Sequence, residues 1–379
     1  MESFLPYAHQ SISEADISAV AQALQGERIT RGENVAALEQ EVAQYVGSRY
    51  AIAFSSGSAA LACAFQAARV GPSDRIVSSP NTFITSVARG VELGAKLHLV
   101  DIDAYGNMDI SLLPDIVNVP YSRGKTIIVP VHYAGVALDM KALDELIRIP
   151  EVMIIEDAAH ALGSFYPDGQ KVGSCAYSDM TIFSFHPAKN ITTAEGGMVT
   201  TNDRELAERL KVARDSGIQR TSPWYYEVEQ ISCNYHMSEL HAALGRSQLK
   251  RIDQFRAAKD RLITAYRNRF ERVPGLHLPP DGADARTHYH LFQVHIEFEP
   301  LQLTRDLVME SLAAAGIGTQ YHYVPLYRNP CLHLPSQGYP TMESHFARSL
   351  SIPFFSSMTE KDVDRVSSAL RRILYKVYE

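Results

Sequence analysis

Short runs of apolar residues alternate with stretches of helical periodicity through the first half of the chain. Apolar residues recur at helical spacing between the runs, for example in SAALACAFQAARV (58–70) and DMKALDELIRI (139–149). Strand patterns that alternate with helix patterns predict a mostly parallel sheet with right-handed crossover connections. The runs expected to form this sheet are YAIAF (50–54), RIVSS (75–79), KLHLVDID (96–103), TIIVPVHY (126–133), VMIIED (152–157) and GGMVTTN (196–202).

Helical patterns flank this region on both sides. Ser13 and Asp16 have the spacing of a capping box at the start of SISEADISAVAQALQ (11–25). The apolar residues of that predicted helix share one face: Ile17, Val20, Ala21 and Leu24. A turn and a second amphipathic helix are expected over 29–47, and a turn and a long helical pattern over 231–270. From about Val273 the pattern becomes α+β and ends in a helix over 359–378.

The 379 residues therefore suit two domains. We expect an α/β fold with a large domain over residues 1–250, in which a mostly parallel sheet is flanked by helices and preceded by a helical segment. A smaller α+β domain over 251–379 is expected to follow, joined to the first by a long helix.

Composition narrows the class of protein. A hydrophobic content of 46% and a charged content of 21% are typical of a globular protein, and the formal net charge of −7 argues against nucleic acid as a partner. The cysteines are far apart, which predicts neither a disulfide framework nor a zinc site: Cys63, Cys175, Cys233 and Cys331. No apolar run has membrane-spanning length and the N-terminus lacks signal-peptide order, so a cytoplasmic location is expected.

Three features of the sequence together predict a site for pyridoxal 5′-phosphate. Lys189 stands alone in TIFSFHPAKNITTAEGG (181–197), and a loop lysine by itself is more often a solvated surface residue. Asp157, however, ends a buried strand pattern, where ligands of α/β sheets bind. The turn Ser55–Ser58 precedes a helix and presents N–H groups and hydroxyls to an anion. This cofactor needs such a lysine, an acid at its pyridinium nitrogen and a phosphate cradle.

The chain resembles the DegT/DnrJ/EryC1/StrS aminotransferases nearly from end to end. The motifs that carry the resemblance are ITRGENVAALEQEVAQYVGSRYAIAFSSGSAAL, EDAAHALGS, SFHPAKNITTAEGG, NYHMSELHAALGRSQLKRID and LSIPFFSSMTEKDV. It implies a fold type I enzyme with pyridoxal phosphate held as an aldimine on Lys189 and pyridoxamine phosphate as an intermediate. It also implies a homodimer with shared active sites that transfers the amino group of L-glutamate to a nucleotide-linked keto sugar.

Within the family, PYAHQSI, PWYYE and GIGTQYHYVPLYRNP are most similar to the aminotransferases that act at C4 in pseudaminic acid biosynthesis. The implied acceptor is a UDP-linked 4-keto-6-deoxy-N-acetylamino sugar. Another 3-keto or 4-keto sugar on a dTDP or GDP carrier is the alternative. A related sugar dehydratase would have histidine in place of Lys189, and the intact set of site residues argues against a non-catalytic regulatory relative.

The resemblance also implies roles for individual residues. The implied catalytic residues are Lys189, Asp157 as partner of the pyridinium nitrogen and His160 near the phenolic oxygen of the cofactor. The implied phosphate ligands are Gly57, Ser58 and Ser184, and Phe83 would lie on the pyridine face. Asn234 would reach the cofactor phosphate in the partner subunit. Asn234 is expected to open a long helix. The implied substrate neighbours are Tyr7, Thr30, His322 and Tyr323.

Several residues depart from the family pattern. Cys233 and His236 replace glycine and arginine beside Asn234, and Ala194 replaces a glycine in the lysine loop. Tyr327 and Asn329 replace histidine and glutamine and are expected at the substrate-facing edge. His288, His290 and His295 invite a metal-site interpretation, with His288 and His290 on one strand face, but no acidic or cysteine ligand accompanies them, so no metal is expected.

Overall fold

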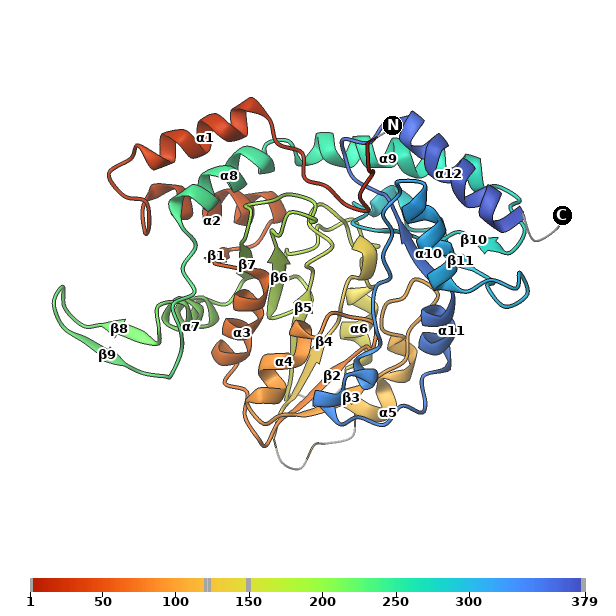
Figure 1. Cartoon of the computed structure of the whole chain (residues 1–379). Helices are drawn as coiled ribbons and strands as arrows, with labels where there is room; N and C mark the ends of the chain where they lie inside the picture. Colours follow the sequence, from red (N-terminus) through yellow and green to blue (C-terminus); the bar gives the residue numbers. More distant parts are fainter. Residues whose placement is uncertain (1–2, 119–120, 122–123, 148–150, 376–379) are drawn as a thin grey trace.

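The larger sheet of the protein forms its framework (Figure 1). The computed structural model describes residues 3–118, 121, 124–147 and 151–375. Over this part of the chain the sheet has seven strands in the order β1-β7-β6-β5-β4-β2-β3. Strand β7 is antiparallel to β1 and β6, and the other neighbours are parallel, which confirms the predicted mostly parallel sheet. The strands are β1 (Tyr50–Phe54), β2 (Arg75–Ser78), β3 (Lys96–Leu99), β4 (Thr126–Val129), β5 (Val152–Asp157), β6 (Met180–Ser184) and β7 (Gly197–Thr201).

The antiparallel β7 brings the lysine loop to the edge where β5 ends. Residues 185–196 join β6 to β7, and Ser184 at the end of β6 pairs with Gly197 at the start of β7. Strand β5 runs parallel to β6, with Asp157 opposite Ile182. The carboxyl ends of β5 and β6 therefore meet the loop that carries Lys189 at one edge of the sheet.

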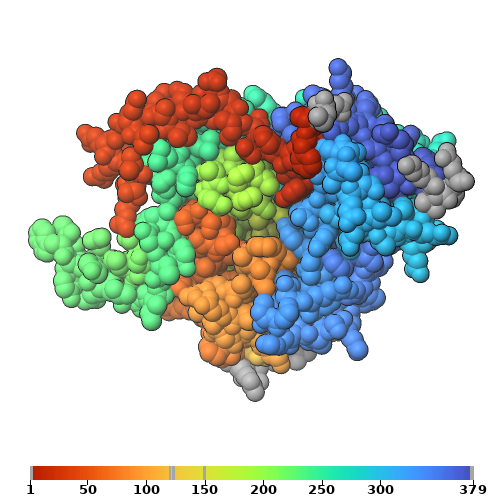
Figure 2. Space-filling view, in the orientation of Figure 1, coloured from red at the N-terminus to blue at the C-terminus, as the bar shows by residue number. Residues whose placement is uncertain are grey.

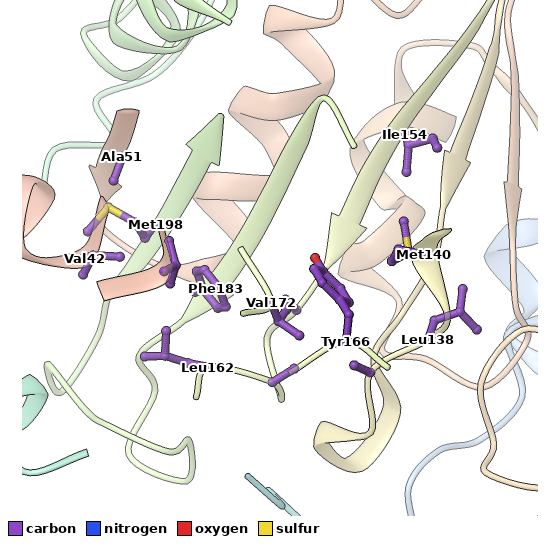
Figure 3. Packing of buried hydrophobic residues seen from close by; sticks show 14 of the residues in the cluster. Val42, Ala51, Leu138, Met140, Ile154, Leu162, Tyr166, Val172, Phe183 and Met198 are labelled. Carbon is purple, nitrogen blue, oxygen red and sulfur yellow. The ribbon is translucent and has the colours of Figure 1, made fainter. Parts of the chain in front are cut away.

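Both faces of the sheet are buried, because alternate residues pack on opposite sides. Ile182 and Val199 belong to one apolar cluster. Phe183 and Met198 belong to the other, part of which Figure 3 shows. Each such fully buried side chain contributes roughly 1.5–3 kcal/mol. The first cluster includes α3 (Gly57–Ala67), α4 (Thr85–Glu92) and α7 (Arg204–Arg214); the second includes α2 (Glu33–Val46), α5 (Pro114–Val117) and α6 (Met140–Leu146).

The N-terminal helix α1 (Glu14–Leu24) begins with the predicted capping box. The Ser13 hydroxyl accepts from the Asp16 N–H, and the Asp16 carboxylate accepts from the Ser13 N–H at 2.8 Å. Helix α1 packs against α8 (Glu239–Leu249), where Gln248 Nε2 donates to Asp16 at 2.9 Å. Its predicted apolar face is exposed in the single chain, with Ile17 at 55% and Leu24 at 61%.

The C-terminal part has its own sheet and apolar core. The long helical pattern forms two helices, α8 and α9 (Ile252–Phe270), separated by Lys250 and Arg251. Antiparallel strands follow in the order β10-β11-β12, and Tyr266, Phe292 and Leu370 pack in their core together with Leu5 from the N-terminus. A domain boundary at residue 250 stays a prediction. The elements are β10 (Leu276–His277), β11 (Phe292–Ile296), β12 (Ser349–Ile352), α10 (Arg305–Ala314), α11 (Pro340–Arg348) and α12 (Glu360–Tyr375).

The end of the last predicted helix, beyond Tyr375, lies outside the described residues, as does the end of the helix predicted over 139–149. Short 3-10 helices connect the larger elements: η1 (Ile110–Leu112), η2 (Tyr133–Gly135), η3 (Asp284–Arg286), η4 (Leu326–Arg328) and η5 (Pro330–Leu332). Among the described helices, none combines the length and apolar character needed to cross a membrane.

A hairpin that the hydrophobic pattern did not predict projects from the body of the protein. Strands β8 (Ile218–Arg220) and β9 (Tyr226–Val228) pair antiparallel and form this arm, residues 218–228 (Figures 1 and 2). Its apolar residues are exposed, Trp224 at 86% and Tyr225 at 57%. A short hairpin is marginally stable in isolation, so we expect the arm to rest on a surface outside the single chain.

Candidate active site

A cavity of about 400 Å³ opens where β5 and β6 end. Its wall combines the start of α3, the lysine loop and C-terminal residues that precede η4. Nearly all residues predicted from the sequence line it: Tyr7, Gly57, Ser58, Phe83, Asp157, His160, Ser184, Lys189, His322 and Tyr323. Thr30 and Asn234 do not line it. The fold thus brings together chain segments that are far apart in the sequence.

Lys189 is held on a loop that is hydrogen-bonded to itself. Its N–H donates to the His186 carbonyl at 2.8 Å, and the Thr193 N–H donates to the Phe185 carbonyl at 2.9 Å. Burial lowers the pKa of Lys189 to about 8, and the attraction of the Asp157 carboxylate offsets only part of this effect. A fraction of the amine is therefore uncharged near neutral pH, as a nucleophile or general base requires.

Asp157 presents its carboxylate to the cavity from the last position of β5. Its Oδ2 accepts from the Ser86 hydroxyl at 2.6 Å, and its Oδ1 accepts from the Ala159 N–H at 3.1 Å. The Thr82 hydroxyl lies 2.6 Å from that of Ser86 and donates to it when Ser86 donates to Asp157. These bonds hold the carboxylate in one orientation, as an acid that must meet a ring nitrogen requires.

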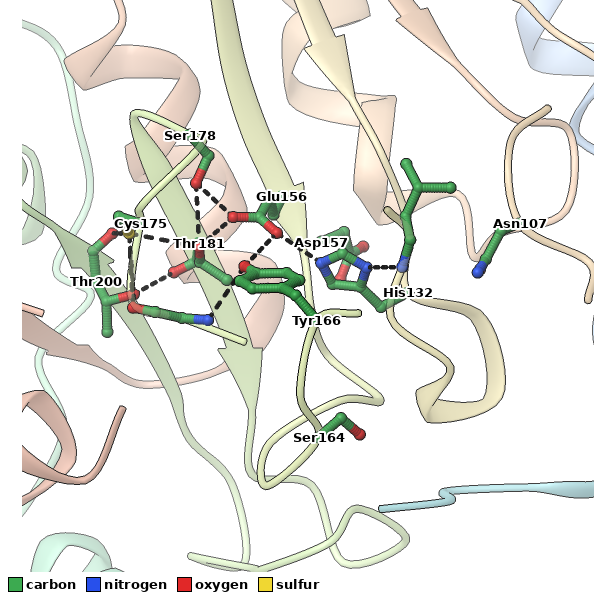
Figure 4. A network of polar contacts seen from close by, with 12 residues as sticks. Asn107, His132, Glu156, Asp157, Ser164, Tyr166, Cys175, Ser178, Thr181 and Thr200 are labelled. Carbon is green, nitrogen blue, oxygen red and sulfur yellow. Dashed lines mark hydrogen bonds and ion pairs between the residues drawn. The ribbon is translucent and has the colours of Figure 1, made fainter. Parts of the chain in front are cut away.

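The neighbouring Glu156 anchors the same strand end from the opposite face (Figure 4). Its carboxylate accepts hydrogen bonds from His132 Nε2 (2.6 Å), Tyr166 OH (2.7 Å), Thr181 Oγ1 (2.8 Å) and the Ser178 hydroxyl. Burial alone would raise the pKa of Glu156, but the bonds from His132, Ser178 and Tyr166 outweigh it and lower the pKa. The Leu138 N–H donates to His132 Nδ1 at 3.1 Å, so the proton of His132 is on Nε2. A satisfied buried anion of this kind stiffens the strand that carries Asp157.

A cradle for an anion lies at the N-terminus of α3. The Ser56 hydroxyl caps this helix by accepting from the Ala59 N–H at 3.1 Å. A Cβ atom on Gly57 would lie 2.8 Å from Cβ of Ser184, and one on Gly197 would lie 2.3 Å from the Ser56 carbonyl oxygen. Only glycine permits this close approach of helix and strand. The N–H groups at the start of α3 and the Ser184 side chain therefore lie next to each other in the cavity wall, and N–H groups at a helix N-terminus bind phosphate.

His160 is a neutral, buried imidazole in the wall of the cavity. Burial, and then the charge of Lys189, lower its pKa well below the usual value. Its Nε2 lies 3.0 Å from the Tyr323 hydroxyl, and its ring lies 4.3 Å from that of His290. Its Nδ1 is buried with no hydrogen-bond partner in the described part of the chain. An unpartnered polar atom at this place fits a bound group with an oxygen. Phe83 also lines the cavity; its ring centroid lies 6.1 Å from that of Tyr323, and the residue is 55% exposed.

Asn234 and Thr30 are both exposed, and neither lines this chain's cavity. The backbone of Asn234 forms an isolated antiparallel β-bridge with Asp215, and its Oδ1 accepts from the His236 N–H at 3.1 Å. The backbone of Thr30 forms a similar bridge with Ser238. The expectation that Asn234 opens a helix is wrong, because α8 begins at Glu239 with the Ser238 hydroxyl as its cap. Its role at a partner's phosphate stays a prediction.

The histidines near residue 290 do not share a strand face. His288 and His290 precede β11, which begins at Phe292, so the expectation of one strand face is wrong. His288 Nδ1 lies 3.0 Å from the Leu162 carbonyl oxygen, and His295 Nε2 lies 3.2 Å from Nδ1 of His345. Within the described residues, no three His, Cys, Asp or Glu side chains are grouped to hold a metal ion.

The departures Tyr327 and Asn329 were expected at the substrate-facing edge, and this expectation is wrong. Tyr327 stacks on Tyr339 with ring centroids 4.8 Å apart, and its hydroxyl donates to Glu343 at 2.6 Å. The Asn329 amide donates to carbonyl oxygens within its own turn. Neither residue lines the cavity. Both are explained by packing of the C-terminal segment.

Ala194 keeps a backbone conformation that favours glycine. Its φ is +66°, and its N–H donates to the Thr192 hydroxyl at 2.9 Å. The left-handed conformation costs an alanine about 1–2 kcal/mol. The alanine therefore adopts the left-handed conformation at this position of the loop.

His236, another departure, places its Nε2 3.2 Å from Oδ1 of Asp215.

Some residues of the site were not predicted from the sequence. Ser86 orients Asp157, and Thr82, Glu195 and His290 line the cavity. Within residues 78–86 the family resemblance implies a role only for Phe83, although Ser86 stands three residues later. A serine and a histidine of this kind have no local signal, because their roles depend on contacts with distant segments.

Comparison with known proteins assigns the family. The model of the DegT/DnrJ/EryC1/StrS aminotransferase family matches residues 10–371. The protein belongs to this family. It is therefore an aminotransferase that depends on pyridoxal 5′-phosphate, and the predicted cofactor and fold type are confirmed.

Relatives of this aminotransferase match it over nearly their whole length. The spore coat polysaccharide biosynthesis protein SpsC of Bacillus subtilis is 32% identical and covers 98% of this chain, with 97% of its own length matched. The structure of Helicobacter pylori PseC, an aminotransferase involved in the biosynthesis of pseudoaminic acid, aligns with a TM-score of 0.91 at 26% identity, over 99% and 100% of the two chains. The putative sugar aminotransferase Spr1654 of Streptococcus pneumoniae, in its PLP form, aligns with a TM-score of 0.88 at 27% identity, over 99% of each chain.

Proposed function

We propose that this aminotransferase moves the amino group of L-glutamate to the C4 keto carbon of a UDP-linked 4-keto-6-deoxy-N-acetylamino sugar, in a pathway of the pseudaminic acid type. The observation that carries the proposal is the convergence of Lys189, Asp157 and the α3 cradle on one cavity. The alignment with PseC of Helicobacter pylori over both whole chains supports the choice of acceptor.

The cavity residues fit pyridoxal phosphate on physical grounds. Glycine at position 57 lets the start of α3 lie directly against Ser184, and Nδ1 of His160 lacks a partner among the described residues. Gly57, Ser58 and Ser184 would hold the phosphate, Asp157 the ring nitrogen and His160 the phenolic oxygen. When bound, the cofactor supplies an electron sink that stabilises negative charge at the carbon that loses a proton.

Lys189 carries the proton transfers of the reaction. Its amine takes a proton from Cα of glutamate in the first half-reaction, in which 2-oxoglutarate is released. In the second half-reaction the lysine delivers a proton to C4 of the sugar. One general acid and base serves both steps, because a pKa of about 8 leaves both forms of the amine populated near neutral pH.

Side chains from both ends of the chain would contact the sugar. Tyr7 and His322 face the cavity with ring centroids 5.7 Å apart, and Tyr323 lies beside His160. Burial lowers the pKa of His322 to about 4, with a smaller effect of the charge on Lys189, so this imidazole is neutral at pH 7. Neutral donors and acceptors of this kind suit sugar hydroxyls.

A second acceptor is favoured by one observation. SpsC of Bacillus subtilis, a spore coat polysaccharide biosynthesis protein, shares 32% identity with the chain, whereas PseC shares 26%. The alternative function is amination of another nucleotide-linked 3-keto or 4-keto sugar. A sugar dehydratase is disfavoured, since a lysine rather than a histidine occupies position 189.

A substrate panel tests the proposal. The purified enzyme with pyridoxal phosphate and L-glutamate would be given keto sugars that differ in carrier (UDP, dTDP, GDP) and in keto position, and 2-oxoglutarate release would be measured. We expect the UDP-linked 4-keto N-acetylamino sugar to give the highest kcat/KM. A higher value for a dTDP-linked or 3-keto sugar would establish the alternative. No turnover with any keto sugar would overturn both.

We further propose that the enzyme is a homodimer whose active sites are shared. Exposed apolar residues support this proposal: Ile17 and Leu24 on α1, and Trp224 and Tyr225 on the arm. An open hollow of about 1230 Å³ between α1, α2 and α8 lies apart from the catalytic cavity. Asn234 and Thr30 lie outside their own chain's cavity, where a second subunit could use them.

Mixed dimers test whether Asn234 acts in the partner's site. Lys189→Ala and Asn234→Ala homodimers should both be impaired, the second by about tenfold at limiting cofactor, because a bond to a charged phosphate contributes about 1.5–3 kcal/mol. In a mixed dimer of the two variants, sharing between subunits places both lesions in one site and leaves the other site intact. We therefore expect activity above that of either parent when the two are unfolded and refolded together at limiting cofactor.

The control for this experiment is the Asn118→Ala variant mixed with Lys189→Ala, since Asn118 is the residue at the C-terminal end of α5 and does not line the catalytic cavity. Because the Asn118→Ala subunit keeps both Lys189 and Asn234, this mixture measures the activity that unfolding and refolding alone recover. A mixture of Lys189→Ala and Asn234→Ala no better than the average of its parents, with mixed dimers shown by native mass spectrometry, would eliminate the shared site.

A further inference from the structure

Lys259 is a buried ammonium on α9 that takes no direct part in the proposed reaction. Its Nζ lies 2.9 Å from Oδ1 of Asn190 and 3.0 Å from the carbonyl oxygen of Tyr289. The ring of Phe354 lies on another side, with its centroid 5.7 Å from Nζ. The residue is 4% exposed, and burial lowers its pKa to about 7. Burying an ammonium costs free energy, so an apolar side chain would serve better if Lys259 only filled space.

The partner of Lys259 is the residue next to the catalytic lysine. Asn190 is buried, and its Nδ2 donates to the carbonyl oxygens of Leu162 and His288, each at 3.0 Å, and of His160 at 3.3 Å. With Nδ2 surrounded by acceptors, Oδ1 must face a donor. Nζ of Lys259 has N–H groups to donate in both its charged and its neutral form, so Lys259 selects this orientation of the amide.

These bonds connect parts of the chain that meet only in the folded protein. Through Asn190, helix α9 is tied to the loop of Lys189 and to the segment that carries His160. A small hollow of about 20 Å³, on which Lys259, Asn190 and Lys189 all border, lies against this junction. The loop is thus supported through Asn190 by Lys259, which does not line the catalytic cavity.

We propose that Lys259 is a positioning residue, whose ammonium fixes Asn190 and thereby holds the loop of Lys189 against the segment of His160. The proposal rests on the role assigned to Lys189 in the proposed function. Loss of the ammonium would leave Oδ1 of Asn190 buried and unpaired and would free the amide to turn. The loop would then open more often, although no residue that lines the catalytic cavity had been changed.

Hydrogen exchange of the loop tests this directly. In Lys259→Met, which keeps length and apolar stem but removes the donors, the Lys189 and Thr193 amides should exchange at least about tenfold faster, because a hydrogen bond to a charged group contributes about 1.5–3 kcal/mol. Exchange would be followed by mass spectrometry on the holoenzyme and on the protein freed of cofactor. Lys259→Arg should keep protection closer to wild type. Lys361→Met, at an exposed position of α12, is the matched control and should change nothing.

Asn190→Ala removes the other end of the same bond. It should speed exchange of the same amides, and the double variant should exceed the faster single variant by less than about twofold, since both changes break one interaction. In turnover assays kcat should fall about tenfold for Lys259→Met while KM for glutamate stays within about threefold, as expected when orientation of the base is lost.

Unchanged exchange of the loop in a folded Lys259→Met would overturn the proposal, as would acceleration spread evenly over the protein. If Lys259→Met does not fold, Asn190→Ala decides, and normal loop exchange in that variant contradicts the proposal. Failure of the proposed function is distinguishable, because it would appear as a wild-type enzyme without turnover while the exchange measurement on the loop still stands.

Discussion

Replacement of Lys189 by alanine is expected to lower kcat by roughly 10²–10⁴-fold, the usual contribution of a positioned general acid and base. The covalent link to pyridoxal is expected to disappear as well. Lys189 lines the cavity with a pKa lowered to about 8, and alanine has no amine to bind the aldehyde or to move a proton. Visible absorption of the bound cofactor and its fixation by borohydride, located by peptide mass spectrometry, would measure the loss of the link.

Two variants separate amine chemistry from other effects of the change. Lys189→Arg keeps a cation but cannot release its proton, so it should be as inactive as alanine. Lys211→Ala on the exposed side of α7, where the lysine pairs with Glu208, should retain both activity and the absorption band. Wild-type turnover by Lys189→Ala, or borohydride fixation at another lysine, would show that the catalytic lysine had been assigned to the wrong position.

Asp157→Asn should lower kcat roughly 100-fold or more, by analogy with the loss of one preorganised electrostatic group. Asparagine has nearly the same shape and could still accept from Ser86, so the fold should survive. A neutral amide cannot stabilise a protonated ring nitrogen, and the electron sink weakens. Turnover should be measured at saturating cofactor, so that weaker binding is not mistaken for slower chemistry.

The matched control for this variant is Asp306→Asn on the exposed first turn of α10, where a small change in stability and none in turnover is expected. Cofactor occupancy would be quantified for each protein. Near-normal turnover of Asp157→Asn with cofactor fully bound would mean that another acid serves the ring nitrogen. Glu156 could not be that acid, because its oxygens accept from His132, Tyr166, Thr181 and Ser178 on the opposite face of the strand.

The adjacent acids at the end of β5, Glu156 and Asp157, have different roles, one structural and one chemical. Successive side chains of a strand point to opposite faces, so Glu156 and Asp157 enter different environments although they are neighbours in sequence. Glu156 is enclosed by donors from several segments and holds the strand end, whereas Asp157 faces the cavity and keeps one hydroxyl donor, that of Ser86. The backbone of β5 therefore positions both the structural carboxylate of Glu156 and the cavity-facing carboxylate of Asp157.

The exposed arm and the apolar face of α1 give the dimer proposal a physical basis beyond family resemblance. Trp224 is 86% exposed at the tip of the arm, and Leu24 is 61% exposed on α1. Contiguous apolar residues at protruding positions mark interaction surfaces. Asn234 does not line the cavity of its own chain. A second copy of the chain is the partner whose cavity Asn234 would then reach.

Local sequence was sufficient for the elements whose cause is local. Continuous apolar runs predicted the sheet strands because both faces of a mostly parallel sheet are buried, and Ser13 with Asp16 predicted the start of α1 because a capping box spans only one turn. Lys189, Asp157 and Gly57 were likewise predicted, since each stands in a motif next to a strand or helix end, and strand ends of one sheet meet at one edge.

Only the tertiary structure decided which distant residues complete the site. The bond from Ser86 to Asp157, the contact of His290 with His160 and the tie from Lys259 to Asn190 each join positions in separate elements, so no spacing along the chain reveals them. The same holds for Tyr327, which a motif placed at the substrate edge but which packs on Tyr339. The exposed arm and the exposed face of α1 also have no signature in the single sequence, because what covers an apolar residue depends on which surfaces meet after folding.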